Sequence, residues 1–176
     1  AAYRKDISQR YLNGEFVHSD SIKMPDSLKF KTLVTNRTVF GGGGIMPDFF
    51  VPLDTAGNSD YYSELLRGGF LNTFSYSYTD ENRKSLLQKY PSFKKFKADF
   101  SCDEAFMKEF FSYVSKEDKT LKKDEEEYAI SEEAIKLRLK AYLARNLWNT
   151  NEFYQIYNDS NEILKRAVEI IQNNEY

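Results

Sequence analysis

SEEAIKLRLKAYLARNL, residues 131–147, is the stretch with the clearest structural pattern in this chain. Its large apolar residues recur at the spacing that places side chains on one face of an α-helix. They are Ile135, Leu139, Tyr142, Leu143 and Leu147. Ser131 is a favourable N-cap, and the acidic Glu132 and Glu133 suit the positive end of a helix dipole. The stretch therefore predicts an amphipathic helix that begins after Ser131.

A second apolar stripe follows the polar residues 149–151. Its members are Phe153, Ile156, Tyr157, Leu164, Ala167 and Ile171. Because this spacing also fits one helical face, we expect a second helix that pairs with the first as an antiparallel hairpin.

Shorter helical patterns begin after Gly57. Asn58 or Ser59 can cap a helix that Gly68 and Gly69 end in a left-handed turn. Thr79 is predicted to start a further helix, which Pro91 must stop. The segment Ser101-Cys102-Asp103-Glu104 has capping-box form, with Ser101 as the N-cap of a helix. That helix carries Phe106, Phe110 and Val114 at helical spacing.

The residues before Gly57 have a strand-like pattern instead. Residues 28–33 alternate apolar and polar, residues 35–37 suit a tight turn, and residues 38–40 suit a returning strand. Before this β-hairpin, residues 4–12 are expected to form a helix that stops at Gly14. The predicted fold class is mainly α. A β-rich segment, 1–57, precedes a helical domain, 58–176, of about five to six helices.

The composition excludes several classes of site. The chain has 176 residues, with 25 Lys and Arg against 27 Asp and Glu, one Cys and one His. One Cys rules out an internal disulfide framework or a multi-Cys metal cluster, and one His rules out most His-based zinc sites. The net charge of −2 gives no electrostatic reason to bind nucleic acid. No apolar run approaches the roughly 18–20 residues of a membrane span.

Two residues invite a catalytic interpretation. His18 lies beside Ser19, Asp20 and Ser21, but neighbours in sequence rarely meet in the geometry of a catalytic triad. Cys102 lies near a predicted helix start, where the pKa of a thiol can fall, although a small, half-buried structural residue is the simpler interpretation. We therefore assign no residue a catalytic, cofactor-binding or metal-binding role from the sequence.

Two further segments admit both a binding and a structural interpretation. Trp148, with Tyr142, Tyr154 and Tyr157, could form a stacking shelf for a sugar or nucleic acid, or belong to the core. The charged segment 116–127 reads as a solvated linker or frayed helix. A calcium loop is the alternative, although the interleaved Asp, Asn and Gly of an EF-hand loop are missing.

The four glycines from Gly41 to Gly44 are the feature that composition does not explain. A phosphate-binding loop would continue with Lys-Ser/Thr at the start of a helix, whereas this chain continues Ile45-Met46-Pro47. The glycines therefore predict a sharp bend packed closely against another backbone. The residues predicted to form this structural bend are Gly41, Gly42, Gly43, Gly44, Pro47 and Asp48.

With its flanks, the run reads RTVFGGGGIMPD, residues 37–48, and resembles the Arg-x-Val-Tyr-Gly-Gly-Gly-Gly-Ile-x-Pro-Asp segment of the carboxy-terminal processing peptidases, or tail-specific proteases. Phe40 replaces the common Tyr. The helical remainder, with Ala144-Arg145-Asn146-Leu147-Trp148 near its end, is similar to the C-terminal extension of the large Bacteroidetes-type members.

The resemblance implies a serine endopeptidase with a Ser-Lys dyad, a PDZ domain and an extracytoplasmic, periplasmic or cell-envelope location. In that family both dyad residues precede the glycine segment, and no Gly-x-x-Ser-Ala or Gly-Lys-Gly motif occurs before Gly41. We therefore expect a non-catalytic C-terminal fragment. Its partners would be the peptidase core and PDZ domain of the same polypeptide, protein substrates through the parent, and a second copy through residues 28–53.

Two alternatives from other classes remain open. The chain could be a stand-alone helical protein-interaction module with a β-hairpin arm for strand addition. It could also be a small enzyme that uses His18 or Cys102.

Overall fold

A computed structural model describes residues 2–41, 47–55 and 57–175 of the chain. The chain divides into two compact units. The helical unit is Thr55–Lys165, and the smaller unit is Ala1–Asp54 together with Arg166–Tyr176. The predicted class is confirmed, because the described residues are mainly helical with one two-stranded antiparallel hairpin. None of their helices has both the length and the apolar character that crossing a membrane requires.

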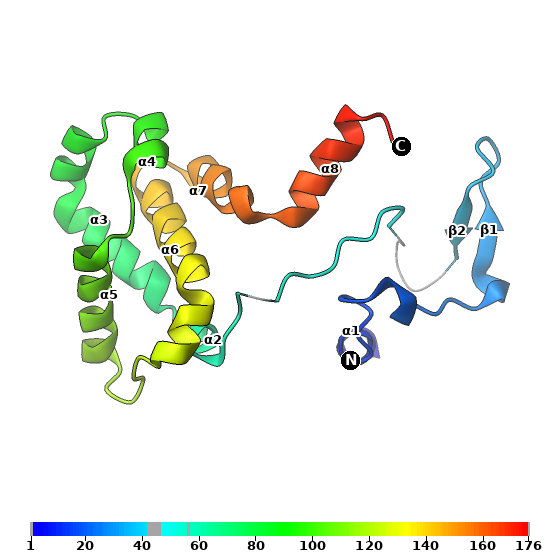
Figure 1. Cartoon of the computed structure of the whole chain (residues 1–176), viewed down its shortest axis with the longest axis horizontal. Coiled ribbons are helices and arrows are strands. Elements are labelled where there is room, and N and C mark those ends of the chain that lie inside the picture. Colours follow the sequence, from blue (N-terminus) through cyan, green and yellow to red (C-terminus); the bar gives the residue numbers. More distant parts are fainter. Residues whose placement is uncertain (1, 42–46, 56, 176) are drawn as a thin grey trace. The chain divides into compact units, whose positions relative to one another are not determined.

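The helical unit is arranged around one long helix, α6 (Glu125–Leu147), which packs against α2, α3 and α7 (Figure 1). The other helices are α2 (Asp60–Arg67), α3 (Phe70–Lys89), α4 (Phe93–Asp99), α5 (Glu104–Glu117) and α7 (Thr150–Tyr157). A 3-10 turn at Asn158–Ser160 leads to α8 (Glu162–Gln172), which begins in this unit.

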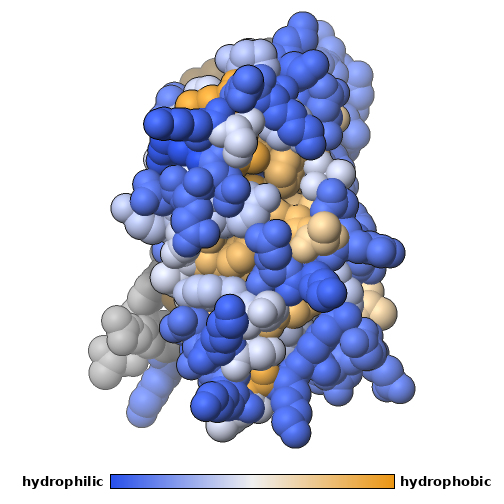
Figure 2. Space-filling model, turned by 90° about the vertical axis from the view of Figure 1, so that its left-hand side faces the viewer, coloured by the Kyte–Doolittle hydropathy of each residue, from blue (hydrophilic) through white to orange (hydrophobic). Residues whose placement is uncertain are grey.

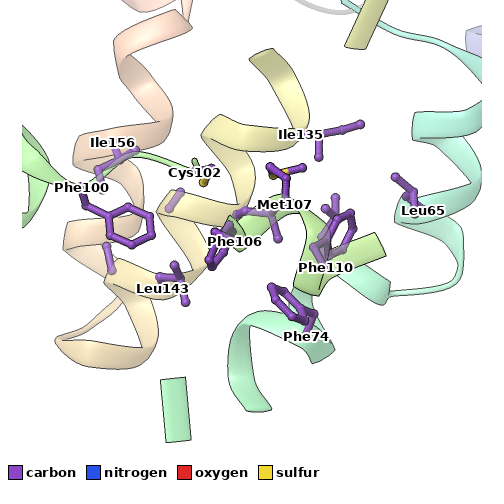
Figure 3. Packing of buried hydrophobic residues seen from close by; sticks show 14 of the residues in the cluster. Leu65, Phe74, Phe100, Cys102, Phe106, Met107, Phe110, Ile135, Leu143 and Ile156 are labelled. Carbon is purple, nitrogen blue, oxygen red and sulfur yellow. The ribbon is translucent and has the colours of Figure 1, made fainter. Parts of the chain in front are cut away.

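The core of this unit is rich in aromatic side chains. Figure 3 shows Phe106 and Phe110 of α5 beside Phe74 of α3, and the ring centroid of Phe74 lies 5.5 Å and 5.3 Å from theirs. Both pairs meet edge to face, the arrangement that aromatic quadrupoles favour. The aliphatic side chains Leu65, Ile135, Leu139 and Leu143 are fully buried in the same cluster. The helical pattern of residues 135–147 therefore faces the core, as predicted.

The start of α2 is held by α6. The side chain of Ser59 accepts a hydrogen bond from the N–H of Tyr62 at 3.1 Å, which confirms Ser59 as the N-cap. Its hydroxyl also accepts a hydrogen bond from the hydroxyl of Ser131, with 2.7 Å between the two oxygens. The N–H of Tyr61 donates to a carboxylate oxygen of Glu127 at 2.5 Å. Two residues of α6 thus complete the first turn of α2.

The prediction that Ser131 starts a helix is wrong. Helix α6 begins at Glu125, with Asp124 as its N-cap accepting from the N–H of Glu127 at 3.0 Å. The acidic first turn suits the helix dipole there. Ser131 is fully buried inside the helix, where Ser59 satisfies its hydroxyl.

Two other predicted helix starts are also wrong. Helix α3 runs through Thr79 without a break, because the Thr79 hydroxyl donates to the carbonyl of Ser75 at 2.7 Å and needs no cap role. Helix α5 is capped by Asp103, which accepts from the N–H of Phe106 at 2.9 Å, and Ser101 lies outside the helix. The expected stop at Pro91 is confirmed, since α3 ends at Lys89.

The second apolar stripe forms two helices instead of one. Helix α7 packs on α6 as expected, but a polar run at residues 158–161 separates it from α8. Side chains in this run bond the backbone and compete with helix hydrogen bonds. The hydroxyl of Ser160 donates to the carbonyl of Tyr157, and Asn161 accepts from the N–H of Leu164.

The smaller unit contains α1 (Ala2–Leu12), 3-10 turns at Ser19–Ser21 and Asp26–Leu28, and the hairpin strands β1 (Lys29–Lys31) and β2 (Thr38–Phe40). The strands are antiparallel, with Phe30 opposite Val39, which confirms the predicted hairpin. Asn36 takes the left-handed conformation that its turn needs, at φ 52°. Gly14, the expected stop of the first helix, has φ 76°.

Candidate functional site

The segment 37–48 is the strongest sequence candidate, and its two ends meet. A guanidinium nitrogen of Arg37 and a carboxylate oxygen of Asp48 form an ion pair. Both side chains are more than half exposed, so the pair fixes geometry and adds at most about 1 kcal/mol to stability. Gly42, Gly43 and Gly44 lie outside the described residues. Pro47 and Asp48 are exposed.

Gly41 is in a crowded position at the end of β2. Its N–H donates to the carbonyl of Leu28 at 2.8 Å. A Cβ atom at this position would lie 2.5 Å from Cε2 of Phe30, which is much closer than van der Waals contact. Only glycine leaves the Phe30 ring where it lies, although this close neighbour is a side chain and not the second backbone that the glycine run predicts.

The residues around His18 do not assemble a triad. His18 is exposed, and its backbone N–H donates to the carbonyl of Gly14 at 2.9 Å. The hydroxyl of Ser19 donates to Asp20, its neighbour in sequence, at 3.4 Å. These bonds close local turns and give His18 no orienting carboxylate.

Cys102 lies in the helical unit, just before α5, and is 8% exposed. Its thiol donates to the carbonyl of Lys136 at 3.4 Å. Burial raises the pKa of this thiol to about 12, and the opposing charges of Lys140 and Lys136 do not offset that effect. The thiol is therefore protonated at neutral pH, which argues against a nucleophilic role.

The aromatic residues near the end of α6 do not form one shelf. Trp148 packs edge to face on Phe93 and Phe96 of α4, with centroid distances of 5.9 Å and 5.4 Å. Tyr142, Tyr154 and Tyr157 instead surround Phe153, which lies 5.2–5.4 Å from each ring. The core interpretation therefore describes Trp148 better than a stacking shelf.

The charged segment 116–127 is largely ordered. Its ends belong to α5 and α6, and Asp118 closes a turn between them by accepting from the N–H and hydroxyl of Thr120 at 2.8 Å and 2.6 Å. These bonds hold the pKa of Asp118 below its usual value. Among the described residues, no three His, Cys, Asp or Glu side chains gather as a ligand set for a metal ion.

Sequence reasoning missed a groove in the helical unit, which we call the α5–α6 groove. Its volume is about 540 Å³. It is lined by Cys102, Glu104, Met107, Lys108, Phe111, Ser112, Ser115, Lys123, Tyr128, Glu132 and Lys136. The spacing from Glu104 to Ser115 along one face of α5 was a usable signal, but the facing residues come from segments that only the fold brings together.

Elsewhere the surface of this unit is mixed. Figure 2 shows the face to which α3 and α5 contribute, where hydrophobic residues appear in small patches between charged side chains. Isolated apolar residues of this kind are ordinary on a protein surface.

Together these features define a mainly helical protein with an aromatic core and a lined groove, joined to a small unit that carries a hairpin and a glycine-rich segment. The chain belongs to the family of unknown function DUF8443, which matches residues 61–149. The match runs from α2 to the residues just after α6, so it lies within the helical unit. No curated protein and no solved structure matches the chain.

Proposed function

We propose that this chain is the non-catalytic C-terminal part of a serine endopeptidase that processes protein C-termini by hydrolysing peptide bonds. The observation that carries the proposal is the sequence of residues 37–48, with its Arg, four glycines and Pro-Asp pair. The Ser-Lys dyad and the PDZ domain would lie elsewhere in the same polypeptide. The location would be extracytoplasmic, in the periplasm or cell envelope.

The packing around this segment supports a role as a bend. The ion pair brings Arg37 and Asp48 together, and Gly41 leaves room for the Phe30 ring. The residues after Asp48 therefore begin close to the end of the preceding hairpin. In the parent enzyme these residues and the hairpin would lie against the peptidase core.

Exposed apolar side chains in the smaller unit are consistent with a missing neighbour. Phe30, Leu33, Val34, Val39, Phe49 and Leu53 are between 38% and 103% exposed. Large apolar patches usually mark interaction surfaces. The peptidase core would cover them in the parent, whereas a second copy would cover them in the isolated chain. The helical unit would then be accessory, for substrate access or self-association.

The proposal is tested with the polypeptide that the complete gene encodes. A peptide with a fluorogenic group near an apolar C-terminus should be cleaved by this polypeptide and not by the present chain. In the complete polypeptide, Arg37→Ala removes the ion pair that joins the two ends of the segment and should lower cleavage modestly, while Arg67→Ala on the exposed surface of α2 should not. Cleavage by the present chain alone, or a gene without a Ser-Lys core, would contradict the proposal.

One observation favours a second function, a stand-alone interaction module. The helical unit has its own core, and the family match, residues 61–149, lies within that unit and leaves out the glycine segment. The hairpin also has only two strands among the described residues, so each strand has an edge at which a partner strand could add. A gene that encodes the two units with no peptidase core would favour this function.

A further inference from the structure

The α5–α6 groove has the dimensions and the floor of a ligand site. Its volume, about 540 Å³, falls within the range of small-molecule pockets. Cys102, Met107 and Tyr128 form a floor that is at most 8% exposed. The lining residues of α5 run from Glu104 to Ser115, twelve residues that span about 16 Å along one wall, given the rise of an α-helix. The groove is thus elongated and apolar at its base.

Lys123 is held at one side of this groove by two aromatic rings. Its ammonium nitrogen lies 4.2 Å from the ring centroid of Tyr128 and 4.8 Å from that of Phe111. The rings meet at 87°, so they form two walls of a corner around the charge. Cation–π contacts of this kind position an ammonium group without neutralising it.

A second lysine converges on the same place. The ammonium group of Lys136 lies 2.7 Å from a carboxylate oxygen of Glu132, and this hydrogen bond is the main cause that lowers the pKa of that carboxyl. The hydroxyl of Tyr128 donates to Glu132 at 3.1 Å as well. Lys136 and Tyr128 thus share Glu132 as a partner, and Lys123 contacts the ring of the same Tyr128, so both ammonium groups lie on the Tyr128 side of the groove.

The carboxylates that already pair with these lysines are poor competitors. Glu125, which contacts Lys123 at 2.6 Å, is 76% exposed, and Glu132 is 39% exposed. Exposed pairs contribute little because water screens them and the side chains lose freedom. Apolar contacts in the groove would hold a ligand anion in place. Lys123 and Lys136 would then gain a partner whose position does not depend on the mobile side chains of Glu125 and Glu132.

We propose that the α5–α6 groove binds a free amphiphilic carboxylate. The apolar body lies along Met107, Phe111 and Tyr128, and the carboxylate accepts hydrogen bonds from Lys123 and Lys136. Exposed charged residues, among them Glu104 and Lys108, belong to the same lining, and burying them in a bilayer would cost desolvation energy. This inference concerns the helical unit alone and does not depend on the proposed protease function.

The test uses the full chain with decanoate and with decyltrimethylammonium, both below their micelle concentrations. Isothermal calorimetry gives the affinity, and two-dimensional NMR locates the perturbed residues. Decanoate should bind and perturb Met107, Phe111 and Tyr128, whereas the cationic amphiphile and acetate should not bind. Lys123→Met and Lys136→Met should each weaken the binding of decanoate about tenfold, because each removes a charge-assisted hydrogen bond.

Lys122→Met is the matched control, since Lys122 is exposed, next to Lys123 in sequence and outside the groove lining. It should leave decanoate binding unchanged. Ser112→Phe places a ring over the groove from an exposed position and should abolish binding without loss of thermal stability. Equal binding of the two amphiphiles, no decanoate binding, or an equal loss in Lys122→Met would overturn the proposal. Binding only to phosphatidylglycerol vesicles would overturn it too.

Discussion

At the scale of single residues, burial decides the chemistry of the one thiol. Burial raises the pKa of Cys102 to about 12, so its thiolate is much less populated near neutral pH than that of an ordinary thiol. Reaction with an aromatic disulfide reagent at pH 8 should therefore be slow in the folded protein and fast in denaturant. Rapid native reaction would show that the thiol is not buried in solution.

The same burial predicts a pH dependence of stability. The thiol of the unfolded chain ionises above about pH 9, while the folded thiol resists ionisation until about pH 12. The contribution of Cys102 to stability is thus complete below pH 9 and decreases as the pH rises from 9 towards 12. The free energy of unfolding, measured with denaturant, should decrease less between pH 8 and pH 10 in Cys102→Ala than in the parent chain. An equal decrease would contradict this origin.

Gly69 is the residue at which backbone conformation restricts the sequence most clearly in the helical unit. Its φ of 71° is left-handed, and it joins α2 to α3. Gly69→Ala should lower the free energy of unfolding by about 1–2 kcal/mol, because a Cβ atom disfavours this conformation. Gly57→Ala is the control, since its added Cβ would meet only Ala134 at an ordinary 3.8 Å. Equal effects of both changes in urea unfolding would refute the argument.

At the scale of elements, two substitutions of Asp124 test whether this residue caps the start of α6. Asp124→Ala removes the acceptor for the N–H of Glu127 and should cost about 1 kcal/mol. Asp124→Asn keeps an acceptor and loses only the charge, so it should lower the free energy of unfolding by only a few tenths of a kcal/mol. Urea unfolding of both variants measures the difference. If the alanine and asparagine variants are equally stable, Asp124 does not cap the helix.

The elements that the sequence predicted well are those with local causes. The hairpin depends on alternation and on Asn36, the end of α3 on Pro91, and the start of α2 on Ser59. The errors arose where several polar residues could cap the same helix. Ser131 and Asp124 are both good N-caps by type, and only the packing of Ser131 against Ser59 decides between them.

The groove could not be predicted for a related reason. Its lining combines one face of α5 with Lys123 from the connection and with Tyr128, Glu132 and Lys136 from α6. Each of these residues has an ordinary explanation in its own segment, as part of a charged run or a helix surface. Their convergence depends on how α5 and α6 are placed, which no local pattern encodes.

At the scale of the whole molecule, the two units should differ in independence. The helical unit holds the aromatic core, while the smaller unit exposes many of its apolar side chains. A fragment of residues 55–161 should therefore fold alone, with the near-ultraviolet circular dichroism of the full chain and a cooperative thermal transition. A fragment that shows helical far-ultraviolet signal without a cooperative transition would mean that the smaller unit completes the core.

The contacts at the first turn of α2 have a kinetic consequence. Its cap, Ser59, bonds Ser131, and the N–H of Tyr61 bonds Glu127, so partners 72 and 66 residues apart must meet before this turn is complete. Closing so long a loop lowers the entropy of the chain, and early in folding few other contacts have formed to offset that loss. The turn should therefore form after the rest of the helical unit, and its amide hydrogens should exchange with solvent sooner than those in the middle of α6.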